Sequence, residues 1–151
     1  MKFIAHRGNI SGPNPLEENK PEYIDAAIQS GFDVEVDVRL LNNKFYLGHD
    51  ESQYYISTTW LNERINLLWI HCKDLNTLEF FSNSRKSFNY FWHQKDDFAL
   101  TSKKYIWTYP GEAYTSKSVI VMPESNPNID FNILKMYNCF GICSDYVESI
   151  K

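Results

Sequence analysis

Short apolar runs alternate with polar, turn-forming segments along the whole chain. Runs of this length with β-branched or aromatic content predict buried strands, and the strand count is close to eight. One helix is well indicated, because Pro21 stands in a first-turn position, an apolar stripe of helical spacing follows, and Gly31 ends it. Three shorter helices are expected over 57–64, 75–81 and 129–137. The candidate strands span 2–6, 33–40, 44–48, 66–72, 88–93, 104–109, 118–122 and 139–144.

This order of elements indicates an α/β protein with a single domain, 1–151. A chain of 151 residues is long enough for one substantial core. A regular eightfold α/β barrel takes about 200 residues or more. If the chain forms a barrel, much of the outer helical ring must therefore be missing.

Composition limits the classes of partner. The net charge is −4 and the lysines are scattered, so the basic stripe typical of a nucleic-acid binder is absent and we expect neither DNA nor RNA as a partner. The first residues turn polar after a few apolar positions, and no long apolar run follows. We therefore expect no signal peptide, no membrane span and a cytoplasmic location.

All four histidines stand at the ends of apolar runs. In a parallel α/β arrangement the carboxyl ends of the strands meet at one rim, where ligands bind and catalysis takes place. We therefore expect the four imidazoles to share one site. They are His6, His49, His71 and His93.

Two carboxylates interrupt a valine-rich candidate strand. Glu35 and Asp37 are two residues apart, so both side chains point to the same face. Buried carboxylates side by side repel each other and lose hydration, which favours a hard cation held by their oxygen atoms. The alternative is a half-exposed strand whose polar residues face water.

Five features follow one another in a set order over about the first third of the chain. They are His6-Arg7-Gly8, Glu18-Asn19, a helix that ends at Gly31, Glu35-Val36-Asp37-Val38 and Gly48-His49-Asp50. In order and spacing they resemble the motifs of the glycerophosphodiester phosphodiesterases, within the wider superfamily of phospholipase-C-like phosphodiesterases. A weaker similarity follows at Trp107-Thr108 and at 141–146. The resemblance implies a TIM-type (β/α)8 barrel, here compact and helix-poor, which agrees with the strand count.

The resemblance also implies roles for individual residues. His6 and His49 would act as general acid and base, since imidazole titrates near neutrality. Arg7 would hold a phosphate oxygen and oppose the charge that grows in the transition state. Glu35 and Asp37 would hold a divalent metal ion that polarises the phosphoryl group. Reaction through a cyclic phosphate, formed by a neighbouring substrate hydroxyl, is implied as well.

The chain departs from the family pattern at the third metal ligand. His71-Cys72-Lys73 stands where the family has Glu-x-Lys. The resemblance by itself implies Mg²⁺ or Ca²⁺, whereas an imidazole in place of a carboxylate moves the preference towards Mn²⁺ or Zn²⁺. Lys73 keeps the lysine position of the family and is a candidate phosphate contact. The alternative for Lys73 is an ordinary surface lysine.

Three further residues, His93, Glu124 and Asp145, follow apolar runs, and Glu18 belongs to one of the motifs above. His93 has no counterpart in the family and is either a head-group contact or a buried hydrogen-bonding group. Glu18 is either a carboxylate that lines the site or a residue stabilised by the positive end of the helix dipole. Glu124 and Asp145 are assigned no chemistry.

The sequence therefore predicts a metal-dependent hydrolase of a small, glycerophosphodiester-like phosphodiester. A lyase that stops at the cyclic phosphate is mechanistically close to it. A catalytically inactive module that binds a phosphate or a sugar on the same fold is the alternative from another class. A third possibility is metal-independent acid–base cleavage, with Arg7 and Lys73 in place of the ion. The sequence does not determine the oligomeric state or the physiological substrate.

Overall fold

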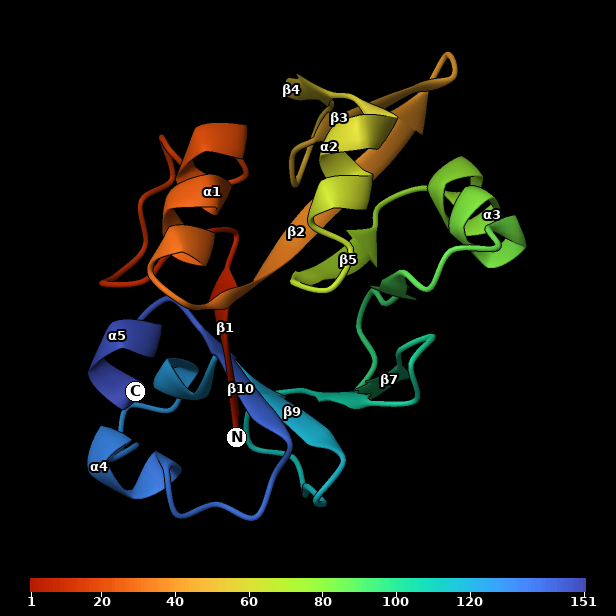
Figure 1. Cartoon of the computed structure of the whole chain (residues 1–151). Coiled ribbons are helices and arrows are strands. Elements are labelled where there is room, and N and C mark those ends of the chain that lie inside the picture. Colours follow the sequence, from red (N-terminus) through yellow and green to blue (C-terminus); the bar gives the residue numbers. More distant parts are fainter.

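The computed structural model describes residues 1–151, with ten strands and five short α-helices (Figure 1). The strands are β1 Lys2–His6, β2 Asp33–Leu41, β3 Lys44–Leu47, β4 Tyr54–Ile56, β5 Leu68–Cys72, β6 Asn89–Phe91, β7 Phe98–Leu100, β8 Ile106–Thr108, β9 Ser118–Val121 and β10 Gly141–Ser144. The helices are α1 Pro21–Gln29, α2 Thr58–Glu63, α3 Leu75–Asn83, α4 Phe131–Leu134 and α5 Val147–Ile150, with a 3₁₀ turn at Pro123–Ser125.

All ten strands belong to one mixed sheet. Eight of them form a curled wall in the order β6-β5-β2-β1-β10-β9-β8-β7, in which every neighbouring pair is parallel except β7 and β8. The other two, β3 and β4, extend from β2 as antiparallel strands. The wall is a half-barrel, so the expected closed TIM-type (β/α)8 barrel is wrong.

The direction of β7 breaks the all-parallel pattern of a (β/α)8 barrel. The connection from Leu100 to Ile106 is short, and β7 pairs antiparallel with β8. A parallel pair needs a crossover of about a dozen residues or more, for which this connection has no room. No strand pairing joins β7 to β6, so the wall stays open between them. The sequence analysis did not predict β7 or β4, which have three residues each.

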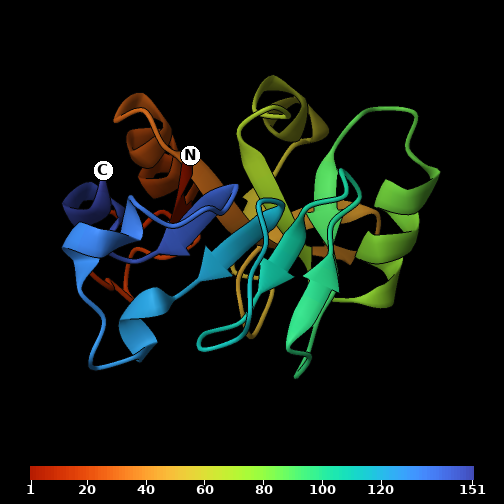
Figure 2. The same ribbon diagram turned by 90° about the horizontal axis from the view of Figure 1, so that it is seen from below.

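Side-chain alternation along β2 separates the core from the site. Val34, Val36 and Val38 are fully buried and belong to a cluster of 17 apolar residues that α1, α2 and α3 cover. A second cluster of eight residues, which includes Trp69 and Trp107, lies on the other face of the sheet. Figure 2 shows that helices cover the outer side of the curl, whereas no helix packs along β7, β8 and β9. These three strands therefore depend on aromatic packing inside the curl.

The first residues of α1, α2 and α3 suit the start of a helix. Pro21 begins α1 as predicted, the Ser57 side chain accepts a hydrogen bond from the backbone N–H of Trp60 at the start of α2, and Asp74 accepts one from Thr77 at the start of α3. The fourth expected helix is reduced to α4, and α5 was not predicted. None of the helices has the length and apolar character needed to cross a membrane.

Phe81 provides a test of the outer core. Its side chain is 1% exposed and packs against Phe45, Phe88 and Tyr90. We expect Phe81→Ala to lower the free energy of unfolding by about 3–5 kcal/mol, since it removes a buried ring and leaves a cavity. Phe98→Ala is the matched control, because Phe98 is 47% exposed and should cost less than about 1 kcal/mol. Urea denaturation measures both, and equal losses would contradict this description of the core.

Candidate functional site

A cavity of about 640 Å³ opens where the parallel strands end. All four histidines line it, together with three cationic side chains. The lining residues are His6, Arg7, Glu35, His49, His71, Lys73, His93, Gln94, Lys95, Trp107, Tyr109, Val121 and Met122. Asp37 and Glu18, also predicted for the site, lie behind this lining.

Two carboxylates and one imidazole lie together in the wall of the cavity. Glu35 and Asp37 project from the same face of β2, and the register of β5 places His71 opposite Asp37. One candidate ligand atom from each residue lies within 4.8 Å of the others. Glu35 is 3% exposed and Asp37 is fully buried, so the alternative of a strand face turned towards water is wrong.

This cluster has the donor set and the unmet hydrogen-bonding capacity that suit a divalent cation. Glu35 Oε2 and Asp37 Oδ1 are buried and accept no hydrogen bond, although buried polar atoms nearly always have a partner. Burial, and then the charge of Asp37, raise the pKa of the Glu35 carboxyl. Burial also acts to raise the pKa of Asp37, but the contact with His71 and the charge of Arg7 outweigh it and hold this pKa well below its usual range. Two carboxylate oxygens and one imidazole nitrogen therefore fit a metal ion.

Side chains from the loop after β1 and from the end of β5 surround the Asp37 carboxylate. Arg7 Nε lies 3.0 Å from Asp37 Oδ2, and Arg7 Nη1 donates a hydrogen bond of 3.0 Å to Glu18. Asn19 donates to Asp37 Oδ2 at 2.9 Å and accepts from the Asp37 backbone N–H at 3.0 Å. Lys73 Nζ lies 3.6 Å from Asp37 Oδ1. Glu18 thus orients Arg7 and does not itself line the cavity.

His6 is held by a carboxylate from the far end of the chain. Its Nδ1 lies 2.8 Å from Asp145 Oδ1, which also accepts a hydrogen bond from Asn9, and its Nε2 lies 4.0 Å from Glu35 Oε2. Burial lowers the pKa of His6, but the hydrogen bond to Asp145 and the charge of Glu35 outweigh burial, so the pKa lies above its ordinary value of 6.5. The surroundings of His6 therefore favour its protonated form more than water does.

His49 reaches the cavity by a different route from the one expected. It follows β3, which is antiparallel to β2, so it does not stand at the carboxyl end of a parallel strand. The guanidinium of Arg39 binds the backbone carbonyls of Gly48 and His49. Gly48 has φ +148°, and a Cβ there would lie 2.1 Å from the carbonyl oxygen of Glu51, so only glycine fits this turn.

The surroundings of His49 are more open than those of His6. Its side chain is 41% exposed, and its Nδ1 lies 2.7 Å from the exposed Asp50 carboxylate. Burial, and then the charge of Arg7, lower the pKa of His49 below 6.5. The two histidines predicted as acid and base thus have pKa values shifted in opposite directions.

His93 lies beside the carboxylate cluster, next to His71. Its ring stacks on the His71 ring with centroids 4.5 Å apart, and the hydroxyl of Tyr109 hydrogen-bonds to its imidazole, with 2.6 Å to Nδ1. Burial and the charges of His71 and Lys73 lower the pKa of His93 to about 4. His93 is therefore a neutral ring at neutral pH.

Sequence reasoning missed the residues that support the site from behind. Asp145 was given no role, although it follows an apolar run just as the histidines do, and that signal could have identified it. Glu124, also left without a role, accepts a hydrogen bond of 2.7 Å from the backbone N–H of Asp145. No signal marked Asn9 or Tyr109, because their roles depend on partners distant in the sequence.

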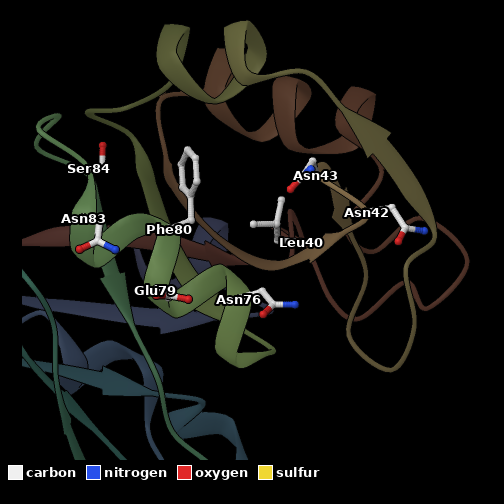
Figure 3. Close-up of a pocket in the computed structure, with 8 residues that line it drawn as sticks. All are labelled: Leu40, Asn42, Asn43, Asn76, Glu79, Phe80, Asn83 and Ser84. Carbon is white, nitrogen blue, oxygen red and sulfur yellow. The ribbon is translucent and has the colours of Figure 1, made fainter.

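A second hollow of about 530 Å³ lies between the β2–β3 turn and α3 (Figure 3). It contains amides, one carboxylate and two apolar side chains, but no histidine, lysine or arginine. Because it has no imidazole to transfer a proton and no cationic side chain to hold a phosphate, it is not a candidate for phosphoryl chemistry. Its lining residues are Leu40, Asn42, Asn43, Asn76, Glu79, Phe80, Asn83 and Ser84.

No protein-family model, no curated protein and no solved structure matches this chain. The resemblance to glycerophosphodiester phosphodiesterases therefore depends on the sequence motifs alone. Function has to be argued from the geometry of the cavity.

The contact between His6 and Asp145 predicts a measurable pKa. In an NMR titration His6 should titrate above pH 6.5 in the wild type and at lower pH in Asp145→Asn, because the variant loses the carboxylate charge. Since the folded pKa is raised, the stabilisation from protonated His6 is fully present below pH 6.5 and is lost as the pH rises through the folded pKa.

His49 is the internal control for this titration. It should titrate below pH 6.5 in both proteins, because Asp145 is not among the groups that shift its pKa. A His6 pKa that is the same in the wild type and in Asp145→Asn would contradict the orienting role of Asp145.

Proposed function

We propose that the protein is a metal-dependent hydrolase of a small phosphodiester. One observation carries the proposal: a single cavity brings together two histidines of oppositely shifted pKa and cationic side chains. In its wall lies the buried cluster of Glu35, Asp37 and His71, in which two carboxylate oxygens accept no hydrogen bond. Pairs of titratable groups whose environments separate their pKa values are typical of acid–base catalysis.

The pKa directions support one assignment of the two proton transfers. His49, whose pKa is lowered, takes the proton from the attacking hydroxyl, which is either a substrate hydroxyl that forms a cyclic phosphate or a water molecule. His6, whose pKa is raised, gives a proton to the leaving alkoxide, and Asp145 stabilises its charged form. The nucleophile oxygen forms a bond to phosphorus as the bond to the leaving oxygen breaks.

Charge at the cavity surface favours an anionic substrate. Arg7, Lys73 and Lys95 line it, and only one carboxylate does. Arg7 and Lys73 hold non-bridging phosphate oxygens and oppose the negative charge that grows in the transition state. A divalent ion bound by Glu35, Asp37 and His71 supplies Lewis-acid polarisation of the phosphoryl group. The substrate partner in this proposal is a small glycerophosphodiester-like molecule.

One observation favours a second candidate, metal-independent cleavage. Arg7 and Lys73 already pair with Asp37, at 3.0 and 3.6 Å, so the cationic groups of the chain neutralise part of the carboxylate charge by themselves. In that mechanism the two side chains alone oppose the transition-state charge. A chelator distinguishes the two mechanisms.

The first test is hydrolysis of bis(p-nitrophenyl) phosphate and of glycerophosphodiesters with Mg²⁺, Ca²⁺, Mn²⁺, Zn²⁺ or a chelator. We expect metal-dependent turnover, and a loss of about 10²- to 10⁴-fold in His6→Ala and in His49→Ala, since each removes a proton-transfer group. Lys117→Ala, in an exposed loop far along the chain from these histidines, is the control and should keep full activity.

The outcomes separate the alternatives. Activity that persists in chelator supports metal-independent cleavage. A wild type that turns over no substrate with any ion contradicts the proposal that the protein is an enzyme, and favours the catalytically inactive binding module. Full turnover in His49→Ala would exclude its role as the base.

His71 determines the preferred ion in this proposal. We expect His71→Glu to move the preference from Mn²⁺ or Zn²⁺ towards Mg²⁺ or Ca²⁺, because a carboxylate replaces a nitrogen ligand. His71→Ala should weaken Mn²⁺ binding, measured by isothermal titration calorimetry on chelator-treated protein. An unchanged Mn²⁺ affinity in His71→Ala would show that His71 is not a ligand.

A further inference from the structure

His71 lies in a stack of three nearly parallel rings. The Phe91 ring lies 5.2 Å from it with an interplanar angle of 7°, and the His93 ring lies 4.5 Å from it at 14°. His71 and Phe91 belong to neighbouring strands, whose register pairs the two residues. Because the ring is held by stacking, it cannot turn out of its plane without breaking these contacts.

The two nitrogens of His71 face different partners. Nδ1 points to the carboxylates, at 3.1 Å from Asp37 Oδ1 and 3.7 Å from Glu35 Oε1. Nε2 lies 3.4 Å from the backbone carbonyl oxygen of His93. Both partners are acceptors, so each ring nitrogen can donate to its partner only while it carries a proton. When a divalent ion takes the place of the proton between Nδ1 and the carboxylates, the carbonyl accepts the remaining N–H from Nε2 and leaves the Nδ1 lone pair to bind the ion.

His93 is in turn held in place from the end of β8. The hydroxyl of Tyr109 hydrogen-bonds to the His93 imidazole, and the two rings meet at 67° with centroids 4.8 Å apart. Behind Phe91 lies the Trp107 ring, at 4.6 Å. β8 does not pair with β6, so these side chains link the end of β8 to the end of β6 across the open part of the wall.

We propose that this assembly, the aromatic brace of Phe91, His93 and Tyr109, positions His71 so that Nδ1 binds a divalent transition-metal ion. The proposal depends on the metal centre of the proposed function and adds what orients its nitrogen ligand. Groups that hold the other nitrogen of a metal-binding histidine commonly change metal affinity about 10- to 100-fold when they are removed. The brace residues are positioning residues, and none of them is a metal ligand.

The test measures Mn²⁺ binding by calorimetry on chelator-treated full-length protein. We expect His93→Leu to raise the Mn²⁺ dissociation constant at least about 10-fold, since the stacked ring and its link to Tyr109 are lost. His93→Phe keeps a stacking ring and should recover most of the affinity. Tyr105→Phe is the matched control, because Tyr105 lies at the other end of β8 and stacks on Phe140.

A double-mutant cycle shows whether the effect passes through His71. In a His71→Glu background, His93→Leu should change the Mn²⁺ dissociation constant by less than about 2-fold, because no imidazole remains to be positioned. Nitrogen modulation from imidazole in pulsed EPR of bound Mn²⁺ gives a direct readout. It should be present in the wild type, absent in His71→Glu and altered in His93→Leu.

The outcomes separate this proposal from the proposed function. An equal loss of affinity from His93→Leu in both backgrounds, or an unchanged Mn²⁺ affinity in His93→Leu, would overturn the brace while leaving the metal centre intact. A wild type that binds no Mn²⁺ would overturn the metal centre, and the brace with it. Thermal unfolding of each variant shows whether a lost affinity reflects a lost fold.

Discussion

The burial of the Asp37 carboxylate is the constraint on which the rest of the site depends. A fully buried charge is strongly unfavourable unless hydrogen bonds and opposite charges compensate it. Asn19 donates one hydrogen bond to the carboxylate and accepts another from the Asp37 backbone N–H, and the cationic groups of Arg7 and Lys73 approach from the loops after β1 and β5. These contacts hold in place the two loops that carry cationic side chains into the cavity. The charge of Asp37 therefore organises the phosphate-binding side of the site.

Packing of strand β2 in the core fixes the position of the Asp37 carboxylate. Its three valines are packed under the helices, while Glu35 and Asp37 project from the opposite face, where Glu35 lines the cavity and Asp37 lies behind the lining. Any slip of one residue in the pairing of β2 would bury the carboxylates among apolar side chains and expose the valines. Packing of the outer core thus keeps the candidate metal ligands together, and the parallel register with β5 brings His71 to them.

The half-barrel gives similar side chains different environments. His6 lies deep in the wall between Asp145 and Glu35, whereas His49 stands on a turn beyond the hairpin and is 41% exposed. Burial lowers the pKa of His6 but Asp145 and Glu35 outweigh it, whereas burial and the charge of Arg7 lower the pKa of His49. No strand pairing joins β6 to β7, and side-chain contacts connect the two sides of this opening. The contact of His93, after β6, with Tyr109, after β8, is one of these connections.

The sequence by itself determined the features that depend on residues close together along the chain. The alternation in β2 predicted that Glu35 and Asp37 share a face, because a strand repeats every two residues, and Pro21 predicted the start of α1 from local geometry. Tertiary structure decided the rest. The pairing of His6 with Asp145 spans 139 positions, and His71 meets Asp37 only through the register of β2 with β5. No local pattern carries the pairing of His6 with Asp145, because only the folded chain brings such distant segments within hydrogen-bonding range.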